Sequence, residues 1–144
     1  MSEFLASEDD LTNCLLFNTI RAARALNRRY DARLAPYGLT VAQFSVMMIV
    51  RHNLGKTIIE AAEKIAMDRS AFSRNVDLLV GKKLVEKLPA GKGNARTCRL
   101  TAAGDKLLDS VVPRWQAARE EMRALMAGQD PHQFVATLQA LTRG

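Results

Sequence analysis

Apolar residues recur with a helical period along the first quarter of this chain. Ser7 and the acids that follow it are typical of a helix start, and an apolar stripe runs from there to Leu34. The stripe comprises Leu11, Leu15, Ile20, Ala23, Leu26, Tyr30 and Leu34. It predicts one helix of about 28 residues that ends near Pro36, which is too long to be covered by a small domain alone.

Two capping pairs mark further helix starts. They are Thr40 with Gln43 and Thr57 with Glu60. The apolar positions after each pair predict helices over residues 41–52 and 58–66. A tight turn is expected at residues 66–67, directly before another helix start at Asp68.

The segment MDRSAFSRNVDLL, residues 67–79, predicts a half-buried helix with two contrasting sides. Its apolar side carries Phe72, Val76, Leu79 and Val80, and the opposite side carries Ser70, Ser73, Arg74 and Asp77. Residues on the apolar side share helical spacing, which indicates packing rather than stacking on single-stranded bases. The aromatic content of 6% also argues against an RNA-type stacking platform. Short hydroxyl side chains beside an arginine are more than solubility requires, so the polar side is a candidate recognition surface.

The pattern then changes to two short extended runs. LVEKL, residues 84–88, and ARTCRL, residues 95–100, flank the basic, glycine-rich segment PAGKGN and predict a β-hairpin. Thr101 begins a long helix through about residue 127, in which Pro113 is expected to cause a kink. Asp130 and Pro131 begin a last helix through residue 143. The order of elements predicts a mainly α winged helix-turn-helix, a fold whose second helix conventionally enters the major groove.

Length and composition predict one globular domain over residues 1–144. Hydrophobic residues make up 48% of the chain, yet no apolar run approaches the ~20 residues that span a bilayer. The start, MSEFLASEDD, lacks the basic and apolar regions of a signal peptide. We therefore expect a cytoplasmic protein without membrane contact.

The sequence offers no set of residues for catalysis or metal binding. Cys14 and Cys98 form neither a disulfide framework nor a metal-site spacing, and His52 and His132 are far apart and unaccompanied. No nucleophile, base and orienting group come together. We therefore expect no cofactor, no metal site and no enzymatic activity.

Positive charge is concentrated in the middle of the chain. Residues 51–100 hold eleven Lys and Arg against five Asp and Glu, whereas residues 1–50 and 101–144 each hold five of either kind. The net charge of +6 thus lies in one third of the sequence. A localised excess favours a polyanion-binding surface, because each neutralised phosphate releases counterions. A solvated basic patch is the alternative.

Four segments resemble the MarR family of bacterial transcriptional regulators. They are LTVAQFSVM, IIEAAEKIAMDRSAFSRNVDLL, LVEKL and RLTAAGDKLL, and the likeness covers roughly residues 11–127. The resemblance implies a homodimer whose dimerisation helices are residues 1–36 and 102–144, and a DNA-binding lobe over residues 40–101. It implies a regulator, expected to be a repressor, that binds a pseudo-palindromic operator in double-stranded DNA. It also implies a small aromatic or phenolic effector that weakens the DNA complex, and some members respond instead to oxidation of a cysteine in the first helix.

The chain departs from the family pattern at three places. Ala66 in the helix-turn-helix turn and Lys83 before the first wing strand stand where the family usually has glycine. We expect a positive φ at these positions or a shifted helix end that uses Gly81. At the wing tip, Lys92 and Asn94 replace the family's Asp-x-Arg, with Arg96 two residues further on.

The candidate DNA-binding residues divide by expected role. Base or phosphate contact is predicted for Ser70, Ser73 and Arg74, phosphate positioning for Lys56 and Arg69, and wing contact for Lys92 and Arg96. Alternatively, Arg74 only pairs with Asp77 or Asp68 on the surface. Asp77 would be repelled by phosphate, so we expect it to orient Arg74 or a residue of the wing.

A weaker set of residues could line an effector crevice. It comprises Cys14, Phe17, Asn18 and Arg21, with Phe44, Met47 and Met48 opposite. An arginine beside apolar walls would suit an aromatic carboxylate, although such apolar residues are more often plain core. Cys14 is either buried or a redox sensor stabilised by Arg21 of the partner subunit.

Two alternatives to a ligand-responsive regulator remain open at this point. The first is a redox-sensing regulator that acts through Cys14. The second is a winged-helix adaptor for proteins or nucleic acids that lacks sequence-specific readout.

Overall fold

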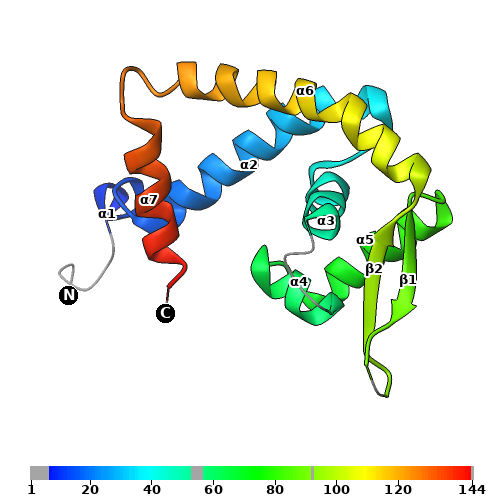
Figure 1. The fold of residues 1–144 in the computed structure, drawn as a ribbon. Helices are drawn as coiled ribbons and strands as arrows, with labels where there is room; N and C mark the ends of the chain where they lie inside the picture. Colours follow the sequence, from blue (N-terminus) through cyan, green and yellow to red (C-terminus); the bar gives the residue numbers. More distant parts are fainter. Residues whose placement is uncertain (1–6, 53–56, 92, 144) are drawn as a thin grey trace.

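The computed structural model describes residues 7–52, 57–91 and 93–143, and it confirms the mainly α fold with a two-stranded wing. Figure 1 shows α6 lying over α2. The lobe formed by α3, α4, α5 and the wing lies below the N-terminal end of α6. The elements are α1 (Glu8–Thr12), α2 (Leu15–Leu34), the 3-10 turn η2 (Ala35–Tyr37), α3 (Val41–Arg51), α4 (Ile58–Lys64), α5 (Arg69–Gly81), β1 (Val85–Pro89), β2 (Arg96–Leu100), α6 (Ala102–Ala124) and α7 (Pro131–Leu141).

The core lies where α3 meets α5, the wing and α6. Met47 of α3, Phe72 of α5 and Leu108 of α6 are fully buried there. The apolar side predicted for α5 is confirmed at Phe72, Val76 and Leu79. It is wrong at Val80, which is 38% exposed because it lies one helical step beyond the packed side.

The first predicted helix is in fact two helices, α1 and α2, separated at Asn13 and Cys14. The side-chain amide of Asn13 donates to the carbonyl oxygen of Asp9 (2.9 Å). The side-chain amide of Asn18 donates to the carbonyl oxygens of Thr12 (2.7 Å), the last residue of α1, and Cys14 (2.9 Å), the N-cap of α2. Asparagine side chains compete in this way with the helical backbone, a local effect that apolar periodicity does not register.

Ala66 adopts the left-handed conformation expected from the missing glycine, with φ of 52°. Its N–H donates to the carbonyl oxygen of Glu63 (3.1 Å), and that of Met67 donates to Ala62 (2.9 Å). These two bonds form a Schellman motif that ends α4 and directs the chain into α5. The helix-turn-helix turn therefore keeps its geometry with a residue that carries a β-carbon.

Lys83 ends α5 in the same way, with φ of 61°. Its N–H donates to Val80 (2.9 Å), and that of Leu84 donates to Leu79 (3.0 Å). The alternative prediction, in which Gly81 would be the left-handed residue that follows the helix, is wrong. Gly81 is still part of α5, as its last residue, and does not have a positive φ.

The remaining helix boundaries agree with the predictions to within a few residues. Thr40 and Gln43 form the expected reciprocal capping box. Pro113 lies inside α6 without ending it, and α6 ends at Ala124 rather than near residue 127. Strands β1 and β2 pair antiparallel, with Val85 opposite Leu100.

The terminal helices expose many apolar side chains in the single chain. Every residue of α7 after Pro131 is exposed, including Phe134 at 48% and Leu141 at 57%. Leu15 and Leu16 at the start of α2 are 73% and 67% exposed. In the described part of the chain, no single helix is long and apolar enough to cross a membrane; only the pair Leu15–Tyr37 and Val41–Arg51, bent by 76°, meets that criterion together.

Candidate nucleic-acid interface

The polar side of α5 is open to solvent at its first two turns. Ser70 and Arg74 are exposed and Ser73 is half-buried. Arg74 makes no hydrogen bond or ion pair with any other residue that the structure describes. Its guanidinium is therefore available as a donor at the centre of this surface.

Asp68 organises the start of α5. It accepts a hydrogen bond from the hydroxyl of Ser70 and one from the N–H of Ala71 (3.4 Å). These bonds, with a smaller contribution from the charge of Arg74, hold the pKa of Asp68 below its usual value. Because the Ser70 hydroxyl donates to Asp68, its oxygen presents lone pairs to an incoming donor.

Asp77 pairs with the wing rather than with Arg74. The ammonium of Lys87 on β1 donates to its carboxylate. Of the two roles expected for Asp77, the structure thus favours the orientation of a wing residue. The ion pair ties the exposed side of α5 to the hairpin and leaves Arg74 unengaged.

The other predicted DNA-binding residues surround this surface unevenly. Arg69 forms an ion pair with Glu63 of α4 (3.2 Å), and both side chains are largely exposed. Arg96 is exposed at the start of β2, where its guanidinium donates to the carbonyl oxygen of Ala95 (3.1 Å). Lys56 and Lys92 lie outside the described residues.

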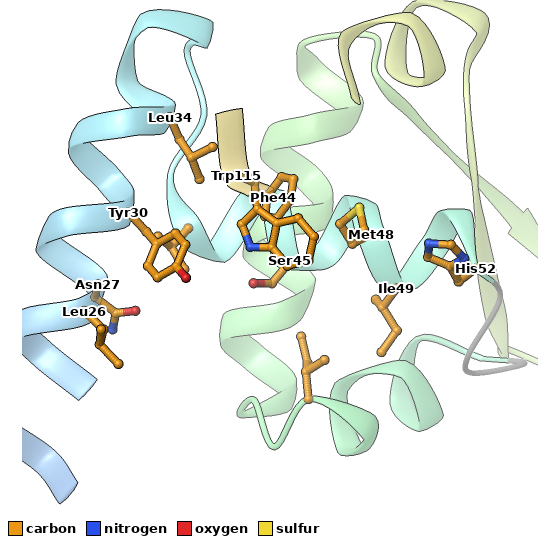
Figure 2. A pocket seen from close by; sticks show the side chains of 12 residues that line it. Leu26, Asn27, Tyr30, Leu34, Phe44, Ser45, Met48, Ile49, His52 and Trp115 are labelled. Atoms are coloured by element: carbon orange, nitrogen blue, oxygen red, sulfur yellow. The ribbon is translucent and has the colours of Figure 1, made fainter. Parts of the chain in front are cut away.

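A cavity of about 460 Å³ separates α2 from the DNA-binding lobe. Figure 2 shows Tyr30 on α2 and Ser45 on α3 with their hydroxyl groups turned toward one another in this view, and the ring of Trp115 above Ser45. The lining residues are Leu26, Asn27, Tyr30, Leu34, Val41, Phe44, Ser45, Met48, Ile49, His52, Ile65 and Trp115. Ile65 immediately precedes Ala66, so one wall of the cavity is the helix-turn-helix turn itself.

Three aromatic residues, Tyr30, Phe44 and Trp115, line this cavity. The rings of Phe44 and Trp115 are 5.6 Å apart between centroids, and the guanidinium carbon of Arg119 lies 5.1 Å from the Trp115 centroid. Burial raises the pKa of Tyr30, and the nearby charges of Arg119 and Arg123 partly oppose this rise. No Lys, Arg, Asp or Glu is among the described lining residues, so the walls favour an uncharged aromatic molecule with hydrogen-bonding groups.

Comparisons with known proteins agree with this architecture. A sequence profile of the MarR family matches residues 37–93. The transcriptional regulator MosR of M. tuberculosis, in a crystal structure with DNA, is 30% identical with a TM-score of 0.81, over 91% of this chain and 95% of that one. The chain belongs to the MarR family.

Two further solved structures resemble this chain over most of its length. Wild-type MarR of E. coli, in its apo form, is 26% identical with a TM-score of 0.67, over 89% of this MarR-family chain and 93% of that one. The transcriptional repressor CouR, bound to a 23-mer DNA duplex, shares the fold at 22% identity and a TM-score of 0.77, over 95% and 97% of the two chains. A comparison with curated protein sequences finds no significant match. The chain is thus a winged-helix transcription regulator.

The predicted effector residues divide between several places in this MarR-family chain. Phe44 and Met48 line the cavity, whereas Met47 is fully buried in the core beside it. Asn18 bridges the break between α1 and α2, and Arg21 lies over the ring of Phe17 at 5.5 Å. Within one chain these residues and Cys14 do not line the cavity that Phe44 and Met48 share, so their role stays a prediction.

Sequence reasoning missed several lining residues of the cavity. Trp115 comes from α6 and Ile65 from the end of α4, far from Tyr30 in the chain. The available signal was local: Tyr30 and Trp115 are polar-tipped aromatics on otherwise apolar helix sides, and such residues usually have a partner when buried.

Proposed function

We propose that two copies of this chain bind a pseudo-palindromic operator in double-stranded DNA and repress transcription until a small aromatic effector binds. The observation that carries this proposal is the exposed guanidinium of Arg74, which has no hydrogen bond or ion pair with another described residue and lies on α5 one turn after Ser70 and next to Ser73. A guanidinium can bond the O6 and N7 atoms of guanine together, and a serine hydroxyl can bond either a base or a phosphate.

The surrounding residues suit phosphate positioning. Arg69 lies at the start of α5, where backbone N–H groups already favour an anion. Arg96 lies at the start of β2, and Lys56 and Lys92, which lie outside the described residues, keep their predicted roles in phosphate positioning and wing contact. Contacts of this kind set the register of the helix on DNA, while Arg74 supplies base readout.

The exposed apolar side chains of the terminal helices support the homodimer. An isolated helix of eleven residues such as α7 is marginal in water, so its apolar residues need cover. Leu11, Leu15 and Leu16 offer a matching apolar surface near the other end of the chain. In this arrangement residues 1–36 and 102–144 form the dimerisation region, and residues 40–101 form the DNA-binding lobe.

The cavity supports the effector-responsive part of the proposal. Its walls join α2 and α6 of the dimerisation region to α3 and to Ile65 beside the helix-turn-helix turn. A ligand that prefers one spacing of these elements changes the orientation of α5, and such a difference in affinity is what shifts a two-state equilibrium. We expect a small phenol rather than the aromatic carboxylate suggested by Arg21.

Replacement of Arg74 by alanine tests specific readout. On the operator found by footprinting, Arg74→Ala should cost about 1–3 kcal/mol of binding free energy, with little change on random duplex. Equal losses on both duplexes would instead support a winged-helix adaptor without sequence readout.

A redox-sensing regulator is the second candidate. Cys14 is half-buried at the N-cap of α2, in the first part of the chain where redox-responsive family members carry their cysteine. This position distinguishes it from Cys98, which lies in the wing.

A further inference from the structure

Helix α2 carries a row of arginines on the side away from the core. It holds five arginines and one aspartate, and all five arginines are exposed. Three of them, Arg21, Arg24 and Arg28, line a groove of about 440 Å³ together with Asn18, Ala22 and Ala25. The two alanines have small side chains and leave space between the longer ones, so the groove can accept a polar chain segment.

Two of these arginines lack a partner in the single chain. Neither Arg24 nor Arg28 forms a hydrogen bond or an ion pair with another described residue, whereas Arg33 on the same helix pairs with Glu121. Three like charges within two helical turns repel one another. An acidic segment in the groove would remove this repulsion.

The chain also carries an acidic helix with no basic partner. Glu8, Asp9 and Asp10 in α1 are all exposed. Asp10 is engaged by Ser7 in a capping box, but the carboxylates of Glu8 and Asp9 make no hydrogen bond or ion pair with a described residue. The equal charges counted over residues 1–50 therefore hide a separation into an acidic α1 and a basic α2.

We propose that the acidic α1 of one copy docks against the arginine groove of α2 in the second copy, so that two symmetric sets of ion pairs orient the dimer. This inference rests on the homodimer of the proposed function and adds to it the surface that fixes the relative position of the two chains. A two-fold axis makes the contact reciprocal, since each copy supplies one acidic helix and one groove.

The second copy is favoured over the chain's own α1. Within one chain, the break at Asn13 leaves α1 with no ion pair to α2, although the two helices are adjacent in sequence. The exposed apolar residues Leu11 and Leu15 follow the acids of α1 in the chain, so an apolar contact between copies would bring α1 to the partner's surface. Charged pairs at the edge of such a contact select orientation and partner more than they add affinity.

Charge exchange on the full-length protein tests the contact, with the dimer dissociation constant measured by sedimentation at about 50 mM NaCl. Arg24→Glu with Arg28→Glu should raise this constant by about tenfold, as should Glu8→Lys with Asp9→Lys. The protein that combines all four substitutions should return to within about threefold of the wild type, because both sets of pairs are restored with exchanged sign. Added salt should weaken the wild-type dimer but not the Arg24→Glu, Arg28→Glu protein, in which it screens the repulsion between like charges instead.

Two controls separate this inference from the homodimer itself. Arg29→Glu reverses one charge on the same helix outside the groove and should leave the dimer unchanged, whereas Arg28→Glu alone should weaken it. Phe134→Glu on α7 should dissociate the dimer whatever the state of the groove. If Phe134→Glu dissociates the dimer but the charge reversals do not, the homodimer stands and the docking contact is overturned.

Three other results would also overturn the contact. One is a protein with all four substitutions whose dimer is weakened by as much as the effects of the two double substitutions added together. Another is a loss of affinity for every duplex in Arg24→Glu, Arg28→Glu with an unchanged dimer, which would assign the groove to nucleic acid. A wild-type protein that sediments as a monomer would refute the homodimer and the contact together.

Discussion

The backbone oxygen of Leu84, at the base of the wing, lies only 2.2 Å from the position that a β-carbon on Gly104 of α6 would occupy. The same oxygen accepts a hydrogen bond from the N–H of Thr101 (3.0 Å), and the Thr101 hydroxyl donates to the backbone carbonyl oxygen of Lys83 (2.7 Å). The absence of a side chain at Gly104 therefore lets α6 start directly against the wing. This contact gives a physical reason for glycine in the segment LTAAG.

Gly104→Ala should destabilise the protein by about 2–3 kcal/mol, because the obstructing atom belongs to the backbone and must move with the wing. Urea unfolding followed by circular dichroism measures the change. Gly81→Ala is the matched control: it lies at the end of α5 with no atom within 4 Å of the added carbon, and it should stabilise by about 0.5–1 kcal/mol. A Gly104→Ala protein as stable as the wild type would contradict the close approach.

Glycine at either left-handed position should stabilise the chain. Ala66 and Lys83 adopt φ values of 52° and 61°, which cost a residue with a β-carbon roughly 1–2 kcal/mol. Since glycine also loses more backbone entropy on folding, the expected net gain for Ala66→Gly and Lys83→Gly is about 0.5–1 kcal/mol each in urea unfolding. Ala71→Gly, inside α5, should lose about 1 kcal/mol instead, and a loss of that kind at Ala66 would refute the strained turn.

Trp115 should report directly on the cavity, because it is the only tryptophan in the chain and is one of the lining residues. Addition of p-cresol should quench its fluorescence saturably, whereas p-hydroxybenzoate should bind more weakly for lack of a charged lining residue. Ser45→Phe fills the cavity and should reduce p-cresol affinity by at least about tenfold. Ala103→Phe, on the exposed surface of α6, should not, and equal responses in the two variants would place the phenol elsewhere.

The two cysteines should differ in reactivity. Burial raises the pKa of the Cys98 thiol to about 11, with the charge of Lys87 opposing this only in part. Because the thiolate is the reactive form, Cys98 should stay protonated at about pH 8 and be alkylated slowly there. Its alkylation should accelerate as the pH rises toward the thiol pKa of about 11. Mass spectrometry after iodoacetamide treatment should find Cys14 modified first.

The redox candidate adds a further expectation for the same thiol. Peroxide should release the protein from DNA, and Cys14→Ser should abolish this response while Cys98→Ser retains it. Retention of the response in Cys14→Ser would remove the redox candidate. Equal alkylation of both cysteines at about pH 8 would contradict the burial of Cys98.

Local chemistry was sufficient to predict most elements of the fold. A cap such as Thr40 or Asp68 bonds to an N–H within three residues, and the packed side of α5 follows from helical spacing. Positive φ at Ala66 and Lys83 was likewise expected from the family pattern, because a helix that must end there has few other conformations. Such interactions depend on neighbours in sequence, so they can be read before the fold is known.

Contacts between distant segments were decided only by the tertiary structure. Asp77 could have paired with Arg74 on its own helix, but the hairpin brings Lys87 to it and leaves Arg74 free. The cavity joins Tyr30, Ile65 and Trp115 from three helices, and the obstruction at Gly104 depends on the position of Leu84 in another element. The sequence by itself determined which sides of which helices are polar or apolar, since each residue carries that property. Folding determined which of these sides meet, because that depends on how the helices and the wing pack in three dimensions.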